Sequence, residues 1–193
     1  MEFVVLGWPP DGPTLRLDYR RFSYAGKFVM STTGKAVVRT TDANESLSGT
    51  NSSEFDDEIL AAVAFNADRS DPETLWLRYV TVRKDRRGDG LGGRLCAFVA
   101  DRAAGHEYGR VNIAVNNPFA YEALYRAGFS FTGDETGLAE LVLSRPAESP
   151  SENRSKQTYQ DGLDRYRERE LSDGETSFLQ RKRSNTPPEV IQR

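Results

Sequence analysis

The sequence predicts an α/β (α+β) domain whose first half is a meander of strands and whose second half alternates strands with helices. Two observations support this class. Up to Val82, short apolar runs alternate with turns rich in Pro, Gly, Ser and Asn, as is typical of strands. Beyond Val82, apolar residues recur at helical spacing in two segments, each directly after a turn signal.

Strands are expected in the first half at Glu2–Gly7, Lys27–Met30, Lys35–Thr40, Glu58–Phe65 and Thr74–Val82. The second and third of these flank Ser31–Gly34, which we interpret as a hairpin turn with glycine at the position of positive φ. The apolar residues at positions 14–28 match the spacing of neither a regular strand nor a regular helix throughout, so either a short helix or an irregular strand fits. The polar stretch Thr41–Asp57 predicts a solvated loop.

The second half is expected to hold a helix from about Gly90 to Ala104, a strand at Arg110–Val115, a helix from about Phe119 to Arg126, and strands at Phe129–Thr132 and Gly137–Leu143. Asn117 followed by Pro118 fits a helix N-cap with proline at the first helical position. We therefore expect a sharply defined start for the second helix.

A change in composition marks a C-terminal extension, so we divide the chain into a domain at residues 1–145 and an extension at residues 146–193. Ser144–Lys156 indicates a linker. The charged stretch Gln157–Arg183 has sparse apolar anchors and a capping-box spacing at Ser172–Glu175. One or two short helices are expected there, either weakly docked, binding a partner, or solvated. Ser184–Arg193 is expected to be disordered.

Bulk composition limits the function classes. The chain has 193 residues, 37% of them hydrophobic, and a formal net charge of -3, which argues against a generally basic nucleic-acid binder. One cysteine excludes an intramolecular disulfide. The first residues lack a basic signal-peptide region, and no run approaches the ~20 apolar residues of a membrane span. We expect a cytoplasmic protein without a membrane partner.

The stretch Val80–Leu95 carries the main functional pattern. An apolar strand ends in basic residues, glycines follow at 88, 90, 92 and 93, and a helix begins. Glycines at a helix start let backbone N–H groups approach an anion, and the helix N-terminus adds partial positive charge. The pattern predicts a phosphate-binding site surrounded by Arg83, Lys84, Arg86, Arg87 and Arg94.

A dinucleotide-binding turn is the rival interpretation, because Gly88, Gly90 and Gly93 also satisfy G-x-G-x-x-G. Five residues separate Val82 from Gly88, whereas that fold turns almost at once. The acidic residue expected about 20 residues further on is also missing. We therefore disfavour this interpretation; a purely structural glycine turn remains a third one.

Two blocks resemble the GNAT superfamily of N-acetyltransferases. Arg87-Gly-Asp-Gly-Leu-Gly92 matches its R/Q-x-x-G-x-G/A signature, and Asn117–Phe129 resembles its N-x-x-A-x-x-L-Y-x-x-x-G-F block. The resemblance covers about Glu58–Leu143. It implies a mixed, mostly antiparallel sheet with helices on both faces and two central strands that splay apart around acetyl-CoA.

The resemblance also implies roles for individual residues. Backbone groups of Val80, Thr81 and Val82 would hold the pantetheine of acetyl-CoA, and Asn117 would lie near the cofactor arm or simply cap its helix. The pyrophosphate would be cradled by the backbone N–H groups of Arg87, Gly88, Asp89, Gly90, Leu91 and Gly92. Tyr125 would be the general acid, since a tyrosine, with a pKa near ~10, can protonate a leaving thiolate whose thiol has a pKa near ~8.5.

Other candidates are weaker. We interpret His106 as a helix C-terminal residue and Cys96 as a packed thiol, and no cluster suggests a metal site. The strand before the glycine turn carries no carboxylate, so the general base is unassigned. The expected activity is direct acetyl transfer to an amine, and a homodimer is compatible with the sequence. The alternatives are a module that binds acyl-CoA without turnover, and transfer of another acyl group such as succinyl.

Overall fold

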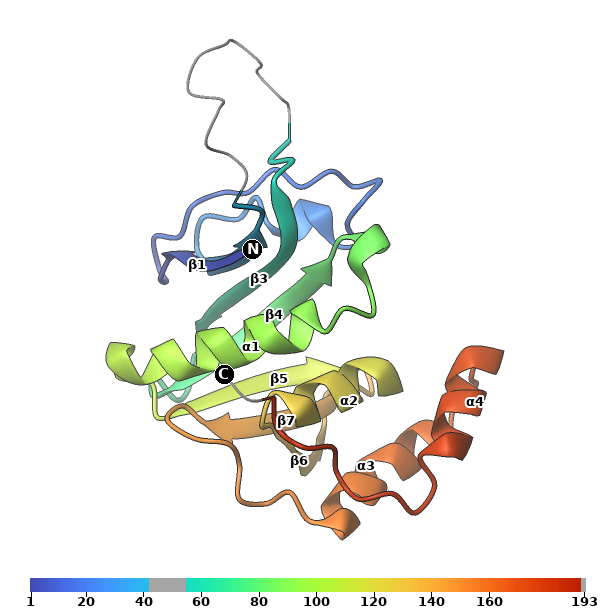
Figure 1. The fold of residues 1–193 in the computed structure, drawn as a ribbon. Helices are drawn as coiled ribbons and strands as arrows, with labels where there is room; N and C mark the ends of the chain where they lie inside the picture. Colours follow the sequence, from blue (N-terminus) through green and yellow to red (C-terminus); the bar gives the residue numbers. More distant parts are fainter. Residues whose placement is uncertain (42–54, 192–193) are drawn as a thin grey trace. The chain divides into compact units, whose positions relative to one another are not determined.

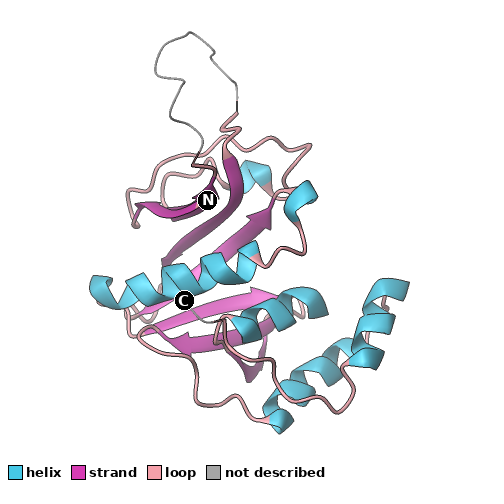
Figure 2. Cartoon of the chain, viewed as in Figure 1, coloured by secondary structure: helices cyan, strands magenta, loops and turns pink. Residues whose placement is uncertain are grey.

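The computed structural model describes residues 1–41 and 55–191, which form seven strands and four α-helices (Figures 1 and 2). The chain divides into two compact units, Met1–Val99 and Ala100–Arg193. Most of the predicted loop at Thr41–Asp57 lies outside the described residues. The mixed α/β class is confirmed, and every strand pair within each unit is antiparallel.

The first unit is the predicted meander. Its strands pair in chain order: β1 (Glu2–Gly7), β2 (Gly34–Arg39), β3 (Ile59–Ala67) and β4 (Thr74–Val82). The continuous apolar run at the start of β3 is buried on both faces, as such runs usually are. The register aligns Val4, Val37, Ala62 and Thr81 in one row, and Phe3, Val38, Ala61 and Val82 in the next. Because side chains alternate along a strand, the two rows face opposite sides of the sheet.

The two faces of this sheet are covered by different segments of the chain. The start of α1 (Leu91–Ala103) packs on the row that contains Phe3, whose ring lies 5.6 Å from that of Phe98. The opposite row joins an apolar cluster with the segment at residues 14–28. That cluster comprises Leu15, Leu17, Phe22, Ala25, Phe28, Val37, Ile59, Ala62 and Ala64. The start of α1 and the segment therefore enclose the sheet from two sides.

The predicted hairpin around Ser31–Gly34 is wrong. Ala25–Lys27 forms the short 3-10 helix η1, residues 28–30 are irregular, and β2 pairs with β1 and β3 instead. Phe22, Ala25 and Phe28 recur every third residue and are all buried. That spacing suits a 3-10 turn, in which residues i and i+3 eclipse. Packing of this stripe onto the sheet therefore decides the local structure.

The second unit pairs β5 (Arg110–Val115) with β7 (Leu141–Pro146), and β7 with β6 (Ser130–Glu135). Strand β7 begins later than predicted, because a turn at residues 136–140, with Ala139 at a φ of 58°, occupies the start of the expected strand. Residues 144–146, which we assigned to a linker, complete β7. The helix α2 (Pro118–Arg126) lies where the Asn-Pro signal predicts it.

The C-terminal extension belongs to the second unit. It forms α3 (Lys156–Arg167), capped by Ser155, and α4 (Asp173–Arg181), whose predicted capping box between Ser172 and Glu175 is present. Its apolar anchors Tyr159, Leu163, Tyr166 and Leu179 are at most 2% exposed. The expectation of a disordered end is wrong for residues 184–191, since the Ile191 N–H donates to the Arg126 carbonyl at 2.8 Å.

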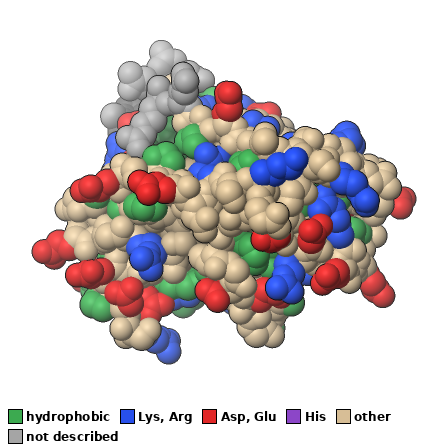
Figure 3. All heavy atoms as spheres, turned by 90° about the horizontal axis from the view of Figure 1, so that it is seen from below, with side chains coloured by type: hydrophobic (Ala, Val, Ile, Leu, Met, Phe, Trp, Pro, Cys, Tyr) green, Lys and Arg blue, Asp and Glu red, His purple; other side chains and the backbone are tan. Residues whose placement is uncertain are grey.

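Basic and acidic side chains both occur on the face drawn in Figure 3, and hydrophobic side chains appear there only in small separate patches. Within residues 1–41 and 55–191, no helix is both long and apolar enough to cross a membrane.

Candidate functional site

The glycine turn has the geometry that the sequence predicts. The 3-10 helix η2 (Lys84–Arg86) follows β4, and α1 begins at Leu91. Gly88 and Gly90 have φ values of 94° and 74°, which other residues rarely adopt. A Cβ at either position would meet nothing within 4 Å. The glycines are therefore required for backbone conformation, and they leave the space beside the helix start open.

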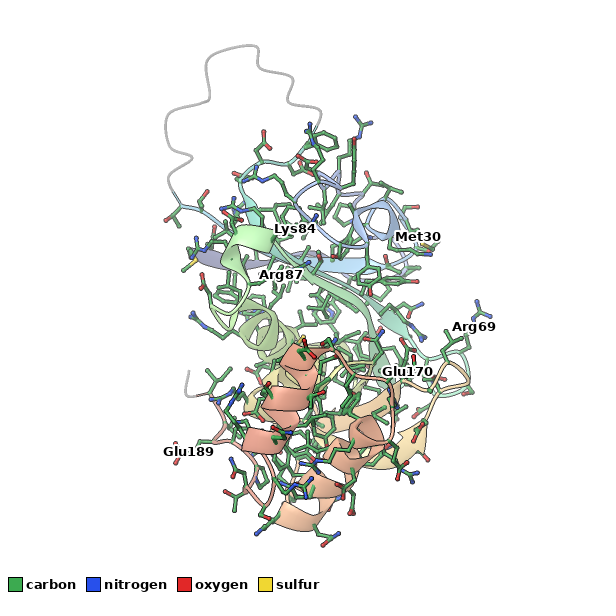
Figure 4. All side chains as sticks on the ribbon, turned by 90° about the vertical axis from the view of Figure 1, so that its right-hand side faces the viewer. Met30, Arg69, Lys84, Arg87, Glu170 and Glu189 are labelled. Carbon is green, nitrogen blue, oxygen red and sulfur yellow. The ribbon has the colours of Figure 1, made fainter. Side chains whose placement is uncertain are left out.

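Two exposed cations of the turn are not committed to a carboxylate among the described residues. Arg83 pairs with Asp85 at 2.7 Å, and Arg86 pairs with Asp89 at 2.8 Å. Lys84 is exposed, and Arg87 donates to the neutral Ser23 hydroxyl at 2.8 Å. Figure 4 shows both on the turn that precedes α1. An anion bound here could contact Lys84 and Arg87 without breaking an ion pair.

Strand β4 lies directly beside this turn. A Cβ at Gly92 would be 3.3 Å from Val82 and 3.8 Å from Val80, so the first turn of α1 packs on these two valines. The Arg83 N–H donates to the Leu60 carbonyl of β3, and Thr81 pairs with Ala62 of the same strand. Because backbone groups alternate in direction along an antiparallel strand, those of Val80 and Val82 point to the edge opposite β3.

Asn117 is confirmed as the N-cap of α2. Its Oδ1 accepts from the Ala120 N–H at 2.9 Å, and its φ and ψ of -140° and 150° are extended, as a cap residue requires. Its Nδ2 group donates to Asn116 at 3.3 Å. The proposed contact with the cofactor arm stays a prediction.

Tyr125 is fully buried in the second unit. Its hydroxyl accepts from the Phe131 N–H at 3.1 Å and lies 3.3 Å from the Tyr121 hydroxyl. The rings of Tyr121 and Tyr159 lie 4.9 Å from its own. Burial raises the pKa of this phenol. A higher pKa makes proton transfer to a thiolate less favourable, so this environment weighs against the acid role, which stays a prediction.

The spacing of the second block adds a further observation. Asn117, Ala120, Gly128 and Phe129 keep the spacing of N-x-x-A-x-x-L-Y-x-x-x-G-F, but Leu124 holds the position of the tyrosine. Tyr125 follows one residue later, which turns a side chain by about 100° around a helix. Tyr125 is thus not the residue that the block itself selects.

The weaker candidates keep their ordinary interpretations. Cys96 is 1% exposed, and burial raises the pKa of its thiol to about 12, so it is not a nucleophile near neutral pH. His106 lies exposed in a 3-10 turn, η3 (Ala104–His106), directly after α1. Among residues 1–41 and 55–191, no group of three His, Cys, Asp or Glu side chains could hold a metal ion. Strand β4 carries no carboxylate, so it offers no general base.

Sequence reasoning missed how closely the extension approaches the predicted site segment of the second unit. The Tyr166 hydroxyl donates to the Val115 carbonyl at 3.0 Å, two residues before Asn117. Arg154 donates to the Tyr125 carbonyl at 2.8 Å. The helical spacing of Tyr159, Leu163 and Tyr166 was the available signal for a buried face.

The structure thus brings the glycine turn and β4 together in the first unit, and places Asn117 and Tyr125 on α2 of the second. The chain matches the model of the "Acetyltransferase (GNAT) family" over residues 18–129, more than half of its length. No curated protein matches the chain.

Three solved structures illustrate its structural similarity. Nourseothricin acetyltransferase has a TM-score of 0.47 at 16% identity, covering 76% of this chain and 98% of that one. An N-acetyltransferase from Staphylococcus aureus Mu50 has a TM-score of 0.45 at 13% identity, covering 60% of this chain and 68% of that one. An aminoglycoside 6'-N-acetyltransferase complexed with coenzyme A has a TM-score of 0.45 at 9% identity, covering 60% of this chain and 73% of that one.

Proposed function

Because this chain belongs to the acetyltransferase (GNAT) family, we propose that it transfers an acetyl group from acetyl-CoA directly to an amine. Acyl transfer with CoA as the carrier follows from the family; the acetyl group and the amine acceptor are the proposal. The observation that supports it best is the glycine turn, with two positive φ values, a helix start and two available cations. These features suit a pyrophosphate.

The first unit supplies the groups that would hold the donor. Backbone N–H groups from Arg87 to Gly92 would bind the pyrophosphate, with Lys84 and Arg87 adding full charges. Val80 and Val82 would pair with the pantetheine through the edge opposite β3, as an added strand does. Such anchoring places the thioester in a fixed position, and positioning of two reactants is a large part of the rate gain in a bimolecular transfer.

The chemistry then requires two proton movements. The amine nitrogen attacks the thioester carbonyl carbon, the carbon–sulfur bond breaks, and CoA leaves as a thiolate that takes up a proton. Since β4 has no carboxylate, we propose that the amine arrives neutral or loses its proton to water. Tyr125 is the proposed donor to the thiolate, although its burial and spacing weigh against that role. We further propose a cytoplasmic protein, with a homodimer as one arrangement.

A matched pair of glycine variants tests the cofactor site. Gly90→Trp is expected to weaken acetyl-CoA binding by at least tenfold, because the ring would fill the space beside the helix start. Gly133→Trp is the control, since Gly133 also has a positive φ, 95°, and nothing within 4 Å of a Cβ. Both variants carry similar backbone strain, but only Gly90 belongs to the turn. Calorimetry that gives equal acetyl-CoA affinities for the two variants would refute the site.

The second test concerns Tyr125. Tyr125→Phe is expected to lower the melting temperature by several degrees, because the buried Phe131 N–H loses its acceptor, a loss of about 1–3 kcal/mol. Thiol release with an amine acceptor decides the catalytic role. A fall of about 10²–10⁴ in kcat is expected of an acid, whereas unchanged kcat in the folded variant would assign Tyr125 to stability alone. Tyr166→Phe, which also loses one buried hydroxyl, is the control.

A second candidate function is an acyl-CoA-binding module that acts through partners without turnover. The absence of a carboxylate from β4 favours it. A broad amine screen with thiol detection separates the two, because only an enzyme releases CoA in step with acceptor consumption. Succinyl-CoA in the same screen tests the choice of acyl group.

A further inference from the structure

Thr81 carries a buried hydroxyl that the fold does not use. The residue is 3% exposed, and among residues 1–41 and 55–191 its Oγ1 has no hydrogen-bond partner. Leaving a buried polar group unpaired is unfavourable, and native structures contain few such groups. Valine has nearly the same shape and flanks this position on both sides, at Val80 and Val82. Thr81 therefore bears a polar group where an apolar one would serve the fold better.

The surroundings of Thr81 explain why no partner is present. Its row in the sheet contains Val4, Val37 and Ala62, and the last two belong to the apolar cluster that packs against residues 14–28. Tyr79, two residues earlier on the same strand, packs against this cluster too. A threonine that only filled space here would still carry the cost of its hydroxyl, whose hydrogen-bonding capacity the described residues leave unused.

We propose that the Thr81 hydroxyl donates a hydrogen bond to the thioester carbonyl oxygen of bound acyl-CoA. The proposal rests on the function proposed above, in which the pantetheine pairs with Val80 and Val82 along the edge opposite β3. Thr81 lies between these two residues, so such an arm would run alongside Thr81, whose side chain projects from the face of the sheet that carries Val37 and Ala62. An added strand presents its groups alternately to the two faces of the sheet, and the Thr81 row is one of those faces. A carbonyl oxygen is the acceptor that a hydroxyl donor fits.

This assignment gives Thr81 a role in transfer as well as in binding. Negative charge develops on the carbonyl oxygen when the amine attacks. A hydroxyl already aimed at that oxygen stabilises the charge without reorganisation. The same residue would make the free protein less stable than its valine variant, a cost that functional sites commonly carry.

The test compares Thr81→Val and Thr81→Ser with the wild type in two measurements. For Thr81→Val in the free protein we expect a melting temperature about 2–4 °C higher, because an unpaired buried hydroxyl is removed. By calorimetry we expect its affinity for acetyl-CoA to fall about five- to tenfold while its affinity for CoA, which lacks the thioester carbonyl, is unchanged. Thr81→Ser keeps the hydroxyl and should keep the wild-type preference for acetyl-CoA over CoA.

The remaining outcomes each contradict one claim. A melting temperature that falls in Thr81→Val would mean that the hydroxyl is already satisfied in the free protein, and would overturn the proposal. Equal loss of affinity for CoA and acetyl-CoA would refute the thioester as the partner, and so would unchanged affinity for both. A wild-type protein that binds neither ligand would refute the proposed function itself, which these binding curves show before any variant is compared.

Discussion

Replacing Gly162 by alanine is expected to destabilise the second unit by about 1–3 kcal/mol, although alanine is the better helix former. A Cβ on this residue of α3 would lie 2.1 Å from the Tyr121 hydroxyl oxygen and 2.5 Å from Cζ. No real contact is that short, so the ring of Tyr121 or the helix must move.

Tyr121 has no free space into which it could move. It is fully buried, its ring contacts those of Tyr125, Phe131, Tyr159 and Tyr166, and its hydroxyl bonds to the Tyr159 carbonyl at 3.1 Å. Relief must therefore come from α3, which would pull its own aromatic anchors from the core. The expected cost is larger than the gain of about 1 kcal/mol in helix propensity.

Gly174→Ala is the matched control. Gly174 also lies in a helix, α4, but a Cβ there would meet nothing within 4 Å. Its replacement should be neutral or slightly stabilising. Urea unfolding of both variants measures the difference. If Gly162→Ala proves as stable as the wild type, α3 does not pack on Tyr121 as described.

The sequence predicted most of the first unit because its signals are local. The apolar run of β3 and the glycine turn need no distant partner to be recognised, and Asn117 with Pro118 marks a helix start by itself. The hairpin failed for the opposite reason. Phe22, Ala25 and Phe28 adopt their conformation by packing on the sheet, and a pattern of three apolar residues does not reveal which surface they will meet.

The extension shows the same limit at larger scale. Its mean composition is charged, so the pattern suggested weak docking or a solvated tail. The charges that matter are paired: Glu122 of α2 is 6% exposed, accepts from Lys182 at 2.6 Å and from Arg126 at 3.3 Å, and bonds to the Tyr159 hydroxyl. A partner 60 residues away is not visible in local spacing. Within the candidate site, the glycine turn could be predicted from local sequence, whereas the environments of Thr81 and Tyr125 depend on tertiary packing.

Removal of the extension is expected to unfold the second unit. A chain ending at Glu152 lacks Tyr159, Leu163, Tyr166 and Leu179, all nearly fully buried. Burial of a large apolar side chain contributes about 1.5–3 kcal/mol, so the four together account for about 6–12 kcal/mol. Domains of ordinary stability unfold at a total cost of only about 5–15 kcal/mol. The loss is therefore comparable with the whole free energy of unfolding, and it also leaves Glu122 without Lys182 and Tyr159.

A shorter deletion supplies the control. A chain ending at Arg183 keeps all four anchors and loses a few hydrogen bonds, including those from Arg154 to the Pro188 carbonyl and from Gln160 to the Asn185 carbonyl. Each is worth about 1 kcal/mol, so this chain should remain folded with a lower melting temperature. Thermal unfolding and dye binding to exposed apolar surface distinguish the two deletions. The chain ending at Glu152 could instead unfold cooperatively near the wild-type temperature. That result would contradict the integral role of the extension and would show that it is only weakly docked.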